Sequence, residues 1–245
     1  MYSNNAVDNN SAVSLRKISI IAGFGLLLMA IIAPFANFSA LQNLIVPEDP
    51  SATYSKISAS IGLFRTGICL FLIVSILDII VAWALYDLFK PVNKSLALLS
   101  SWFRIVYAAI FAVSLNNLFQ IVFLLSGADY LKVFESNQLN VQVMLSLESF
   151  QSGWNIGMVI FGLHLLLLGY LVFKSNYFPK FLGILIVVSG LGYLTDSFGK
   201  LFLPGYIMTI AMFTFIGEVL FIFFLFWRGI KGFEKEPNSM TKNIA

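Results

Sequence analysis

The sequence contains few charged residues, one histidine and one cysteine. Charged residues make up 11% of the 245 residues, compared with about a quarter in an average soluble domain. A single cysteine cannot form an intrachain disulfide, an iron–sulfur site or a CxxC site, and a single histidine cannot supply both axial ligands of a membrane b-type haem. We therefore expect no cofactor and no metal centre.

Recognisable catalytic and nucleotide-binding motifs are also missing. No HExxH, GxSxG, Walker or Rossmann pattern occurs, and no motif places a serine beside His164. We therefore assign no catalytic residue, and an intramembrane enzyme ranks behind the other hypotheses. The net charge of +3 comes from basic residues that are spread over the loops rather than clustered, so nucleic acid is not an expected partner.

Long hydrophobic runs make up most of the chain, which is 59% hydrophobic and has a mean hydropathy of +0.88. A helix needs about 20 apolar residues to cross about 30 Å of hydrocarbon. Six runs are long enough: residues 18–41, 62–88, 95–125, 152–173, 181–203 and 206–228. We predict an all-α, polytopic transmembrane bundle of six helices. It comprises a polar N-terminal tail, the membrane domain and a polar C-terminal tail (residues 1–15, 16–232 and 233–245).

The positions of lysine and arginine predict how the helices cross the membrane. With the N-terminus inside, the inner segments contain Arg16, Lys17, Lys90, Lys94, Lys174, Lys180, Arg228, Lys231, Lys235 and Lys242, and the outer loops contain Lys56 and Lys132. Because basic residues accumulate on the cytoplasmic side, we expect both termini to be cytoplasmic. The first run is too long for the apolar region of a signal peptide, and we expect it to be retained.

Polar segments on the outer side predict helices that extend beyond the membrane. Asp49 followed by Pro50 is typical of a helix start, and no residue after Pro50 ends that helix before Phe89. Such a helix would be roughly 58 Å long at about 1.5 Å per residue, so a large part of it would project from the membrane. Residues 138–148 either continue straight into the fourth span or lie flat at the interface. Either arrangement forms a small extracytoplasmic cap.

Five ionisable side chains lie deep in the predicted spans: Asp78, Arg104, His164, Asp196 and Glu218. Counting from the inner helix ends places all except Asp196 about 14–15 Å from those ends, near the bilayer midplane. Asp196 falls in the outer half. Because a charge at a helix centre costs about 2.5–3.5 kcal/mol, these groups must be paired, neutral or in contact with water. We therefore predict a polar site inside the membrane.

Charge and depth indicate how these side chains pair. Arg104 keeps its proton and needs a carboxylate, and Asp78 is at a similar depth in the adjoining helix. His164 and Glu218 then remain as candidates for a pair that shares a proton.

Helical spacing adds three supporting polar residues. Tyr107 lies on the same helical face as Arg104, and Tyr193 shares a face with Asp196. Lys200 follows Asp196 at the i+4 spacing that favours a same-face ion pair. All three faces are expected to point into the bundle.

Several motifs occur in the order that is found in a known family. They are GLFR (62–65), PVNKSLALL (91–99), SGADYL (126–131), FGLH (161–164) with LGYL (168–171), and GYLTDSF (192–198). With these motifs the chain resembles, over about residues 16–232, the bacterial and archaeal membrane family called domain of unknown function 4386. The resemblance implies a six-helix protein in the cell membrane of a prokaryote. It implies no activity for any residue.

Two hypotheses for function follow from the charges inside the membrane. In the first, they line a cavity that binds or moves a small solute, a proton or a lipid. In the second, the protein is a non-enzymatic membrane partner or structural protein whose buried charges only lock the helix packing. The expected partners are the lipid bilayer and an unidentified small ligand or membrane protein.

Overall fold

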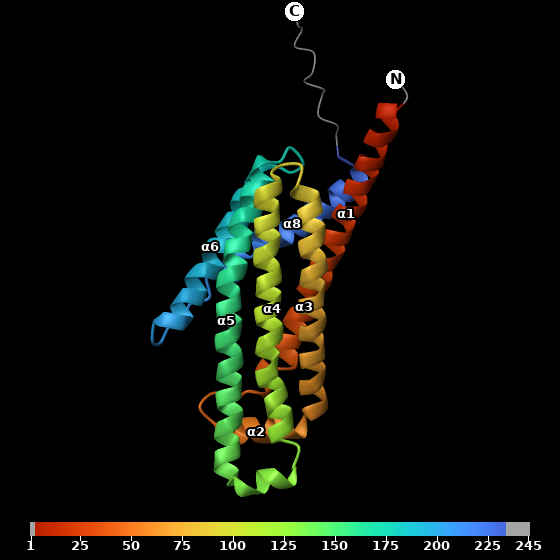
Figure 1. The fold of residues 1–245 in the computed structure, drawn as a ribbon. Coiled ribbons are helices and arrows are strands. Elements are labelled where there is room, and N and C mark those ends of the chain that lie inside the picture. Colours follow the sequence, from red (N-terminus) through yellow and green to blue (C-terminus); the bar gives the residue numbers. More distant parts are fainter. Residues whose placement is uncertain (1–2, 234–245) are drawn as a thin grey trace, which may run out of the picture.

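The protein is all-helical in the computed structural model, which describes the backbone of residues 3–233 and the side chains from Leu15 onward (Figure 1). Within that range there is no β-strand, and six helices are long and apolar enough to cross a membrane. The spans are Leu15–Leu44, Ile61–Phe89, Lys94–Leu124, Ser136–Lys174, Lys180–Phe202 and Ala211–Lys231. The predicted fold class is confirmed.

The helices differ in length and direction. Figure 1 shows α3, α4 and α5 running side by side, with α1 and α6 inclined to them and α8 crossing between α1 and α6. The α-helices are α1 (Ser3–Pro34), α2 (Pro50–Ala59), α3 (Ile61–Phe89), α4 (Lys94–Leu124), α5 (Ser136–Lys174), α6 (Lys180–Phe202), α7 (Ala211–Thr214) and α8 (Ile216–Lys231). Three short turns of other helix types occur at Phe35–Ser39, Gln42–Leu44 and Asp129–Val133 within the described chain.

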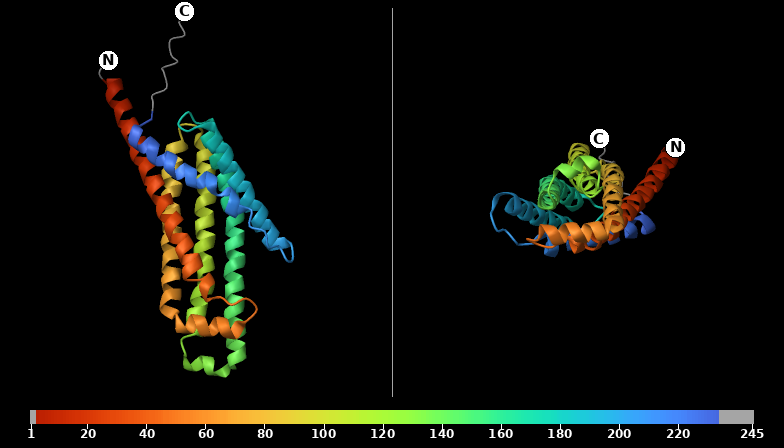
Figure 2. Two further views of the ribbon diagram at one scale, coloured as in Figure 1. Left: turned by 180° about the vertical axis from the view of Figure 1, so that it is seen from behind. Right: turned by 90° about the horizontal axis from the view of Figure 1, so that it is seen from below.

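The six membrane helices contact one another in a closed order. Helix α3 packs on α4, α4 on α5, α5 on α6, α6 on α8, α8 on α1, and α1 returns to α3. The two further views in Figure 2 show the same arrangement from behind and from below. Side chains from all six helices can therefore reach a common centre.

The turn between α3 and α4 is determined by the local sequence. Pro91 follows directly after Lys90, where α3 has ended, and the Asn93 side chain accepts a hydrogen bond from the backbone N–H of Leu96 at 3.0 Å, which caps the start of α4. Asp78 and Arg104 lie at similar distances from this turn on the two antiparallel helices. The hairpin therefore brings them to the same level.

The beginning of α1 and the end of α8 lie at the same end of the bundle (Figure 1). The Arg16 guanidinium donates hydrogen bonds to the carbonyls of Gly229 (3.2 Å) and Ile230 (2.8 Å), and the Ser19 hydroxyl donates to the carbonyl of Leu225 (2.8 Å). The two Arg16 bonds satisfy carbonyls of the last turn of α8, which have no donor within the helix, and the Ser19 bond links α1 to the same helix. The side of the membrane on which this end lies stays a prediction.

One predicted helix is broken in the structure. We expected an unbroken helix from Pro50 to Phe89, but Ser60 leaves the helical conformation (φ −123°, ψ 33°) and separates α2 from α3. Helix α2 then lies across the end of the bundle and packs against α5 (Figure 2). This turn fully buries Thr53 and Ile57, which a straight extension would expose to water. The burial of apolar surface accounts for the break.

The cap that we expected on the outer side is formed by α2, the turn Asp129–Val133 and the first turns of α5, at the end of the bundle opposite the α3–α4 turn (Figure 1). Of the two alternatives for residues 138–148, the straight one holds, because α5 is continuous over 39 residues. Its projecting part is stabilised by packing, since Val143 and Leu147 are buried there.

The start of α2 provides a prediction about the cap. Asp49 Oδ1 accepts a hydrogen bond from the backbone N–H of Ala52 at 2.9 Å, and losing such an N-cap costs about 1 kcal/mol. We expect Asp49→Ala to speed amide hydrogen exchange in α2 about fivefold. Asp129→Ala is the control, because Asp129 is exposed and, in the described chain, forms an ion pair only with Lys132, which is also exposed. Equal exchange rates in α2 for both variants would contradict the capping role.

The sixth span begins later than predicted. We expected it at residues 206–228, but Gly205 has a positive φ of 74°, and the backbone is not helical again until α7. A further turn at Phe215 separates α7 from α8, so that Glu218 lies in the first turn of α8 rather than in the middle of a long helix. Gly205 adopts this conformation readily because it has no Cβ.

Candidate functional site

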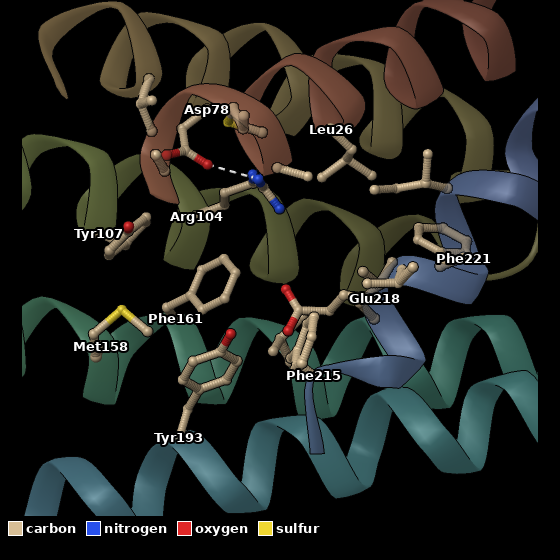
Figure 3. A pocket seen from close by; sticks show the side chains of 18 of the residues that line it. Leu26, Asp78, Arg104, Tyr107, Met158, Phe161, Tyr193, Phe215, Glu218 and Phe221 are labelled. Carbon is tan, nitrogen blue, oxygen red and sulfur yellow. Dashed lines mark hydrogen bonds and ion pairs between the residues drawn. The ribbon is translucent and has the colours of Figure 1, made fainter. Parts of the chain in front are cut away.

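A cavity of about 400 Å³ lies at the centre of the six membrane helices (Figure 3). This volume is within the range of about 300–1,000 Å³ that is usual for small-molecule sites. Most of the lining side chains are apolar. The ionisable ones are Asp78, Arg104, Tyr107, Tyr193 and Glu218.

Asp78 and Arg104 form the ion pair that we expected from the sequence. The distance from Arg104 Nη2 to Asp78 Oδ1 is 2.6 Å, and each side chain is only 3% exposed. The pair joins α3 to α4 on the wall of the cavity (Figure 3). Because both side chains are almost completely buried, removal of either one leaves the other charge without an equivalent partner.

His164 extends this interaction to α5. Its Nδ1 lies 2.9 Å from the backbone carbonyl oxygen of Ser100, and its Nε2 lies 3.3 Å from Arg104 Nη1. A carbonyl only accepts and a guanidinium only donates, so we assign the hydrogen to Nδ1 and leave Nε2 as the acceptor. The ring is then neutral. The proposed proton-sharing pair of His164 and Glu218 does not form here, because both ring nitrogens face α4.

Glu218 and Arg104 each have one atom without a hydrogen-bond partner. Among the buried side-chain nitrogen and oxygen atoms of the described residues, only Glu218 Oε1 and Arg104 Nε are unpaired. Figure 3 shows the Tyr193 hydroxyl pointing toward the Glu218 carboxyl from α6. An unmet buried hydrogen bond costs about 1–3 kcal/mol, and more for a charged group. These two atoms are therefore the strongest sites for a ligand's polar group.

Asp196 lies away from the cavity, contrary to the expected lining. Its Oδ1 accepts a hydrogen bond from the Tyr206 hydroxyl, and its Oδ2 accepts one from the Ala211 N–H, each at 2.7 Å. The bond to Asp196 raises the pKa of Tyr206. Both carboxylate oxygens thus hold the segment between α6 and α7, so Asp196 is not directed toward Lys200. Lys200 is not among the cavity's lining residues either.

Several lining residues could not be identified from the sequence. The guanidinium carbon of Arg104 lies 5.5 Å from the centre of the Phe161 ring. Trp154, Met158 and Phe215 also line the cavity. With 25 phenylalanines in the chain, no pattern distinguishes these side chains from those that face lipid. No group of three or more His, Cys, Asp and Glu side chains that could hold a metal ion occurs among the described residues.

Known proteins place the chain in a family without describing its activity. An uncharacterized protein of Archaeoglobus fulgidus is 42% identical over 162 residues, which cover 66% of this chain and 82% of the relative. No solved structure matches the chain. Over residues 21–229, the chain matches and belongs to the family described as a domain of unknown function, DUF4386.

Proposed function

We propose that this integral membrane protein binds a small amphiphilic molecule in the cavity between its six helices. The observation that carries the proposal is the cavity together with two buried polar atoms that have no hydrogen-bond partner, Arg104 Nε and Glu218 Oε1. By the distribution of basic residues, we place the protein in the cell membrane with both termini in the cytoplasm.

The lining of the cavity favours an amphiphile over a fully polar solute. The charged side chains of the lining come from α3, α4 and α8, whereas Leu26 and Met29 of α1 and Val219 of α8 supply hydrocarbon surface. A ligand with an apolar body gains about 25 cal/mol for each Å² of apolar surface removed from water. A few polar groups then fix its orientation.

A structural role has its own supporting observation. The Asp78–Arg104–His164 interactions and the bond from His164 to the Ser100 carbonyl connect α3, α4 and α5. A network of this kind can lock helix packing without any ligand. We therefore assign a stabilising role to this network. Ligand binding is assigned to the two atoms that have no partner, Glu218 Oε1 and Arg104 Nε.

Trp154 provides a direct test, because it is one of four tryptophans and lines the cavity. The other tryptophans, Trp83, Trp102 and Trp227, are 51%, 62% and 40% exposed and can be replaced by phenylalanine. In phosphatidylcholine nanodiscs, we expect at least one of three amphiphiles of equal chain length, decylamine, decanol and decanoate, to change Trp154 emission in a saturable way.

Filling the cavity is expected to abolish this signal. Ala33→Phe adds a ring from α1 to the cavity wall, whereas Ile31→Phe, on the same helix and 61% exposed, adds a ring outside it. Binding should be lost with Ala33→Phe and retained with Ile31→Phe. Absence of saturable binding of all three probes to the unsubstituted cavity, or equal binding in both variants, would refute the proposed function.

A further inference from the structure

The ionisable side chains around the cavity do not balance in charge. Asp78 and Arg104 neutralise each other at 2.6 Å, and the hydrogen bonds of His164 make that ring neutral. Glu218 adds a second carboxyl, and the cavity lining contains no further basic side chain. An unpaired charge inside a membrane costs about 2.5–3.5 kcal/mol. Glu218 must therefore hold a proton, contact water in the cavity or meet a positively charged group, and only the last of these neutralises an ionised carboxylate.

Arg104 is not available as that group, although it lines the same cavity. Its two terminal nitrogens already bond to Asp78 and His164, and only Nε remains free. Among the described residues, Asp78 is the carboxylate within ion-pair distance of Arg104, and Glu218 has no such contact. Among the lining residues no cation is therefore left for an ionised Glu218, and its counter-charge would come from a bound molecule.

The surroundings of Glu218 suit a carboxylate that is ready to bind a cation. Glu218 lies in the first turn of α8, where the partial positive charge of the helix N-terminus stabilises a negative side chain. The Tyr193 hydroxyl points toward the carboxyl, and the Phe215 ring lies beside it (Figure 3). An aromatic ring attracts an ammonium group on its face by about 0.5–2 kcal/mol.

The same charge balance ranks three classes of amphiphile. A fatty acid would bring a second unpaired carboxylate into the cavity. A fatty alcohol could donate a hydrogen bond to Glu218 Oε1, but it would leave the charge of Glu218 uncompensated. A protonated amine neutralises Glu218, and its hydrocarbon chain packs against the apolar lining.

Building on the proposed function, we propose that the cavity binds a lipophilic cation, an amphiphile with a protonated amine. The Glu218 carboxylate is the counter-charge of the amine, Tyr193 and Phe215 lie beside the ammonium group, and the apolar lining accepts the hydrocarbon chain. The Asp78–Arg104 ion pair forms a part of the cavity wall that has no net charge.

The test compares the affinities of the three probes of equal chain length. It uses the variant in which Trp154 is the only remaining tryptophan. At pH 7 in phosphatidylcholine nanodiscs, we expect decylamine to bind at least about tenfold more tightly than decanol, and decanoate to bind most weakly. Glu218→Gln is expected to remove the preference for decylamine. Glu148→Gln is the matched control, because Glu148 is an exposed carboxylate on α5, and it should leave the preference unchanged.

Each outcome decides one of the two proposals. If decanol or decanoate binds as tightly as decylamine, or if the preference survives in Glu218→Gln, the assignment of a cation is overturned and the binding cavity stands. If none of the probes binds, the proposed function fails as well. The ranking on the unsubstituted cavity keeps the test valid even where Glu218→Gln does not fold. Glu218→Asp, which keeps the charge, is expected to keep the preference.

Discussion

Replacement of Asp78 by asparagine is expected to destabilise the protein by about 3–5 kcal/mol, because it leaves a buried charge without a partner. Arg104 stays protonated in any protein environment, and its side chain is 3% exposed beside a largely apolar lining. The neutral amide cannot replace the carboxylate that lies 2.6 Å from the guanidinium. The free energy of unfolding in mixed lipid–detergent micelles measures the loss.

A second ion pair on the same helix provides the control for Asp78→Asn. Asp87 and Lys90 also form a short ion pair, at 2.7 Å, but their side chains are 20% and 47% exposed. We expect Asp87→Asn to cost about 0–1 kcal/mol, as is usual at a surface. The double variant Asp78→Asn/Arg104→Gln should recover most of the loss, since no buried charge remains. If Asp78→Asn and Asp87→Asn lower the free energy of unfolding by the same amount, the buried pair does not stabilise the helix packing.

The second large effect is expected from Gly169→Ala at the contact between α5 and α6. A Cβ at Gly169 would lie 2.7 Å from the carbonyl oxygen of Gly183, and one at Gly183 would lie 2.6 Å from the carbonyl oxygen of Gly169. Both obstacles are backbone atoms, so the helices themselves must separate. We expect a loss of about 3 kcal/mol in the free energy of unfolding. Separation of α5 from α6 also moves Tyr193 away from the cavity, so binding should weaken.

The same substitution elsewhere shows whether the effect comes from this contact. At Gly62, on α3, a Cβ would meet no atom within 4 Å. Gly62→Ala is therefore expected to stabilise the protein by about 0.5–1 kcal/mol, through helix propensity alone. At Gly157 the nearest atom belongs to the Tyr107 ring, at 3.3 Å, which can move by the small distance required. A loss at Gly169 no larger than that at Gly157 would contradict the close helix contact.

Glycine spacing illustrates how much of the packing the sequence can reveal. Gly153 and Gly157 have the spacing of a helix-contact motif, and α4 side chains cover both of them within the same chain. The contact between helix backbones pairs Gly162 with Gly190 and Gly169 with Gly183, one heptad apart on antiparallel helices. The register between α5 and α6 determines which glycines pair. The sequence of either helix alone does not specify that register.

The sequence alone determined the membrane helices and one ion pair. Hydropathy and length are properties of each segment, so the six spans could be found without knowing their neighbours. Asp78 and Arg104 could be paired because a short turn joins their helices in antiparallel register, and an arginine charge at that depth requires a carboxylate.

Only the tertiary structure decided where the remaining ionisable groups point. Packing of distant segments bends the chain at Ser60, directs His164 toward Arg104, and brings the start of α8, with Glu218, to the cavity. The rotation and crossing of a helix depend on surfaces that are far apart in the chain. Helical spacing placed Tyr107 and Tyr193 on inward faces, but among apolar side chains no local pattern reveals which face is buried.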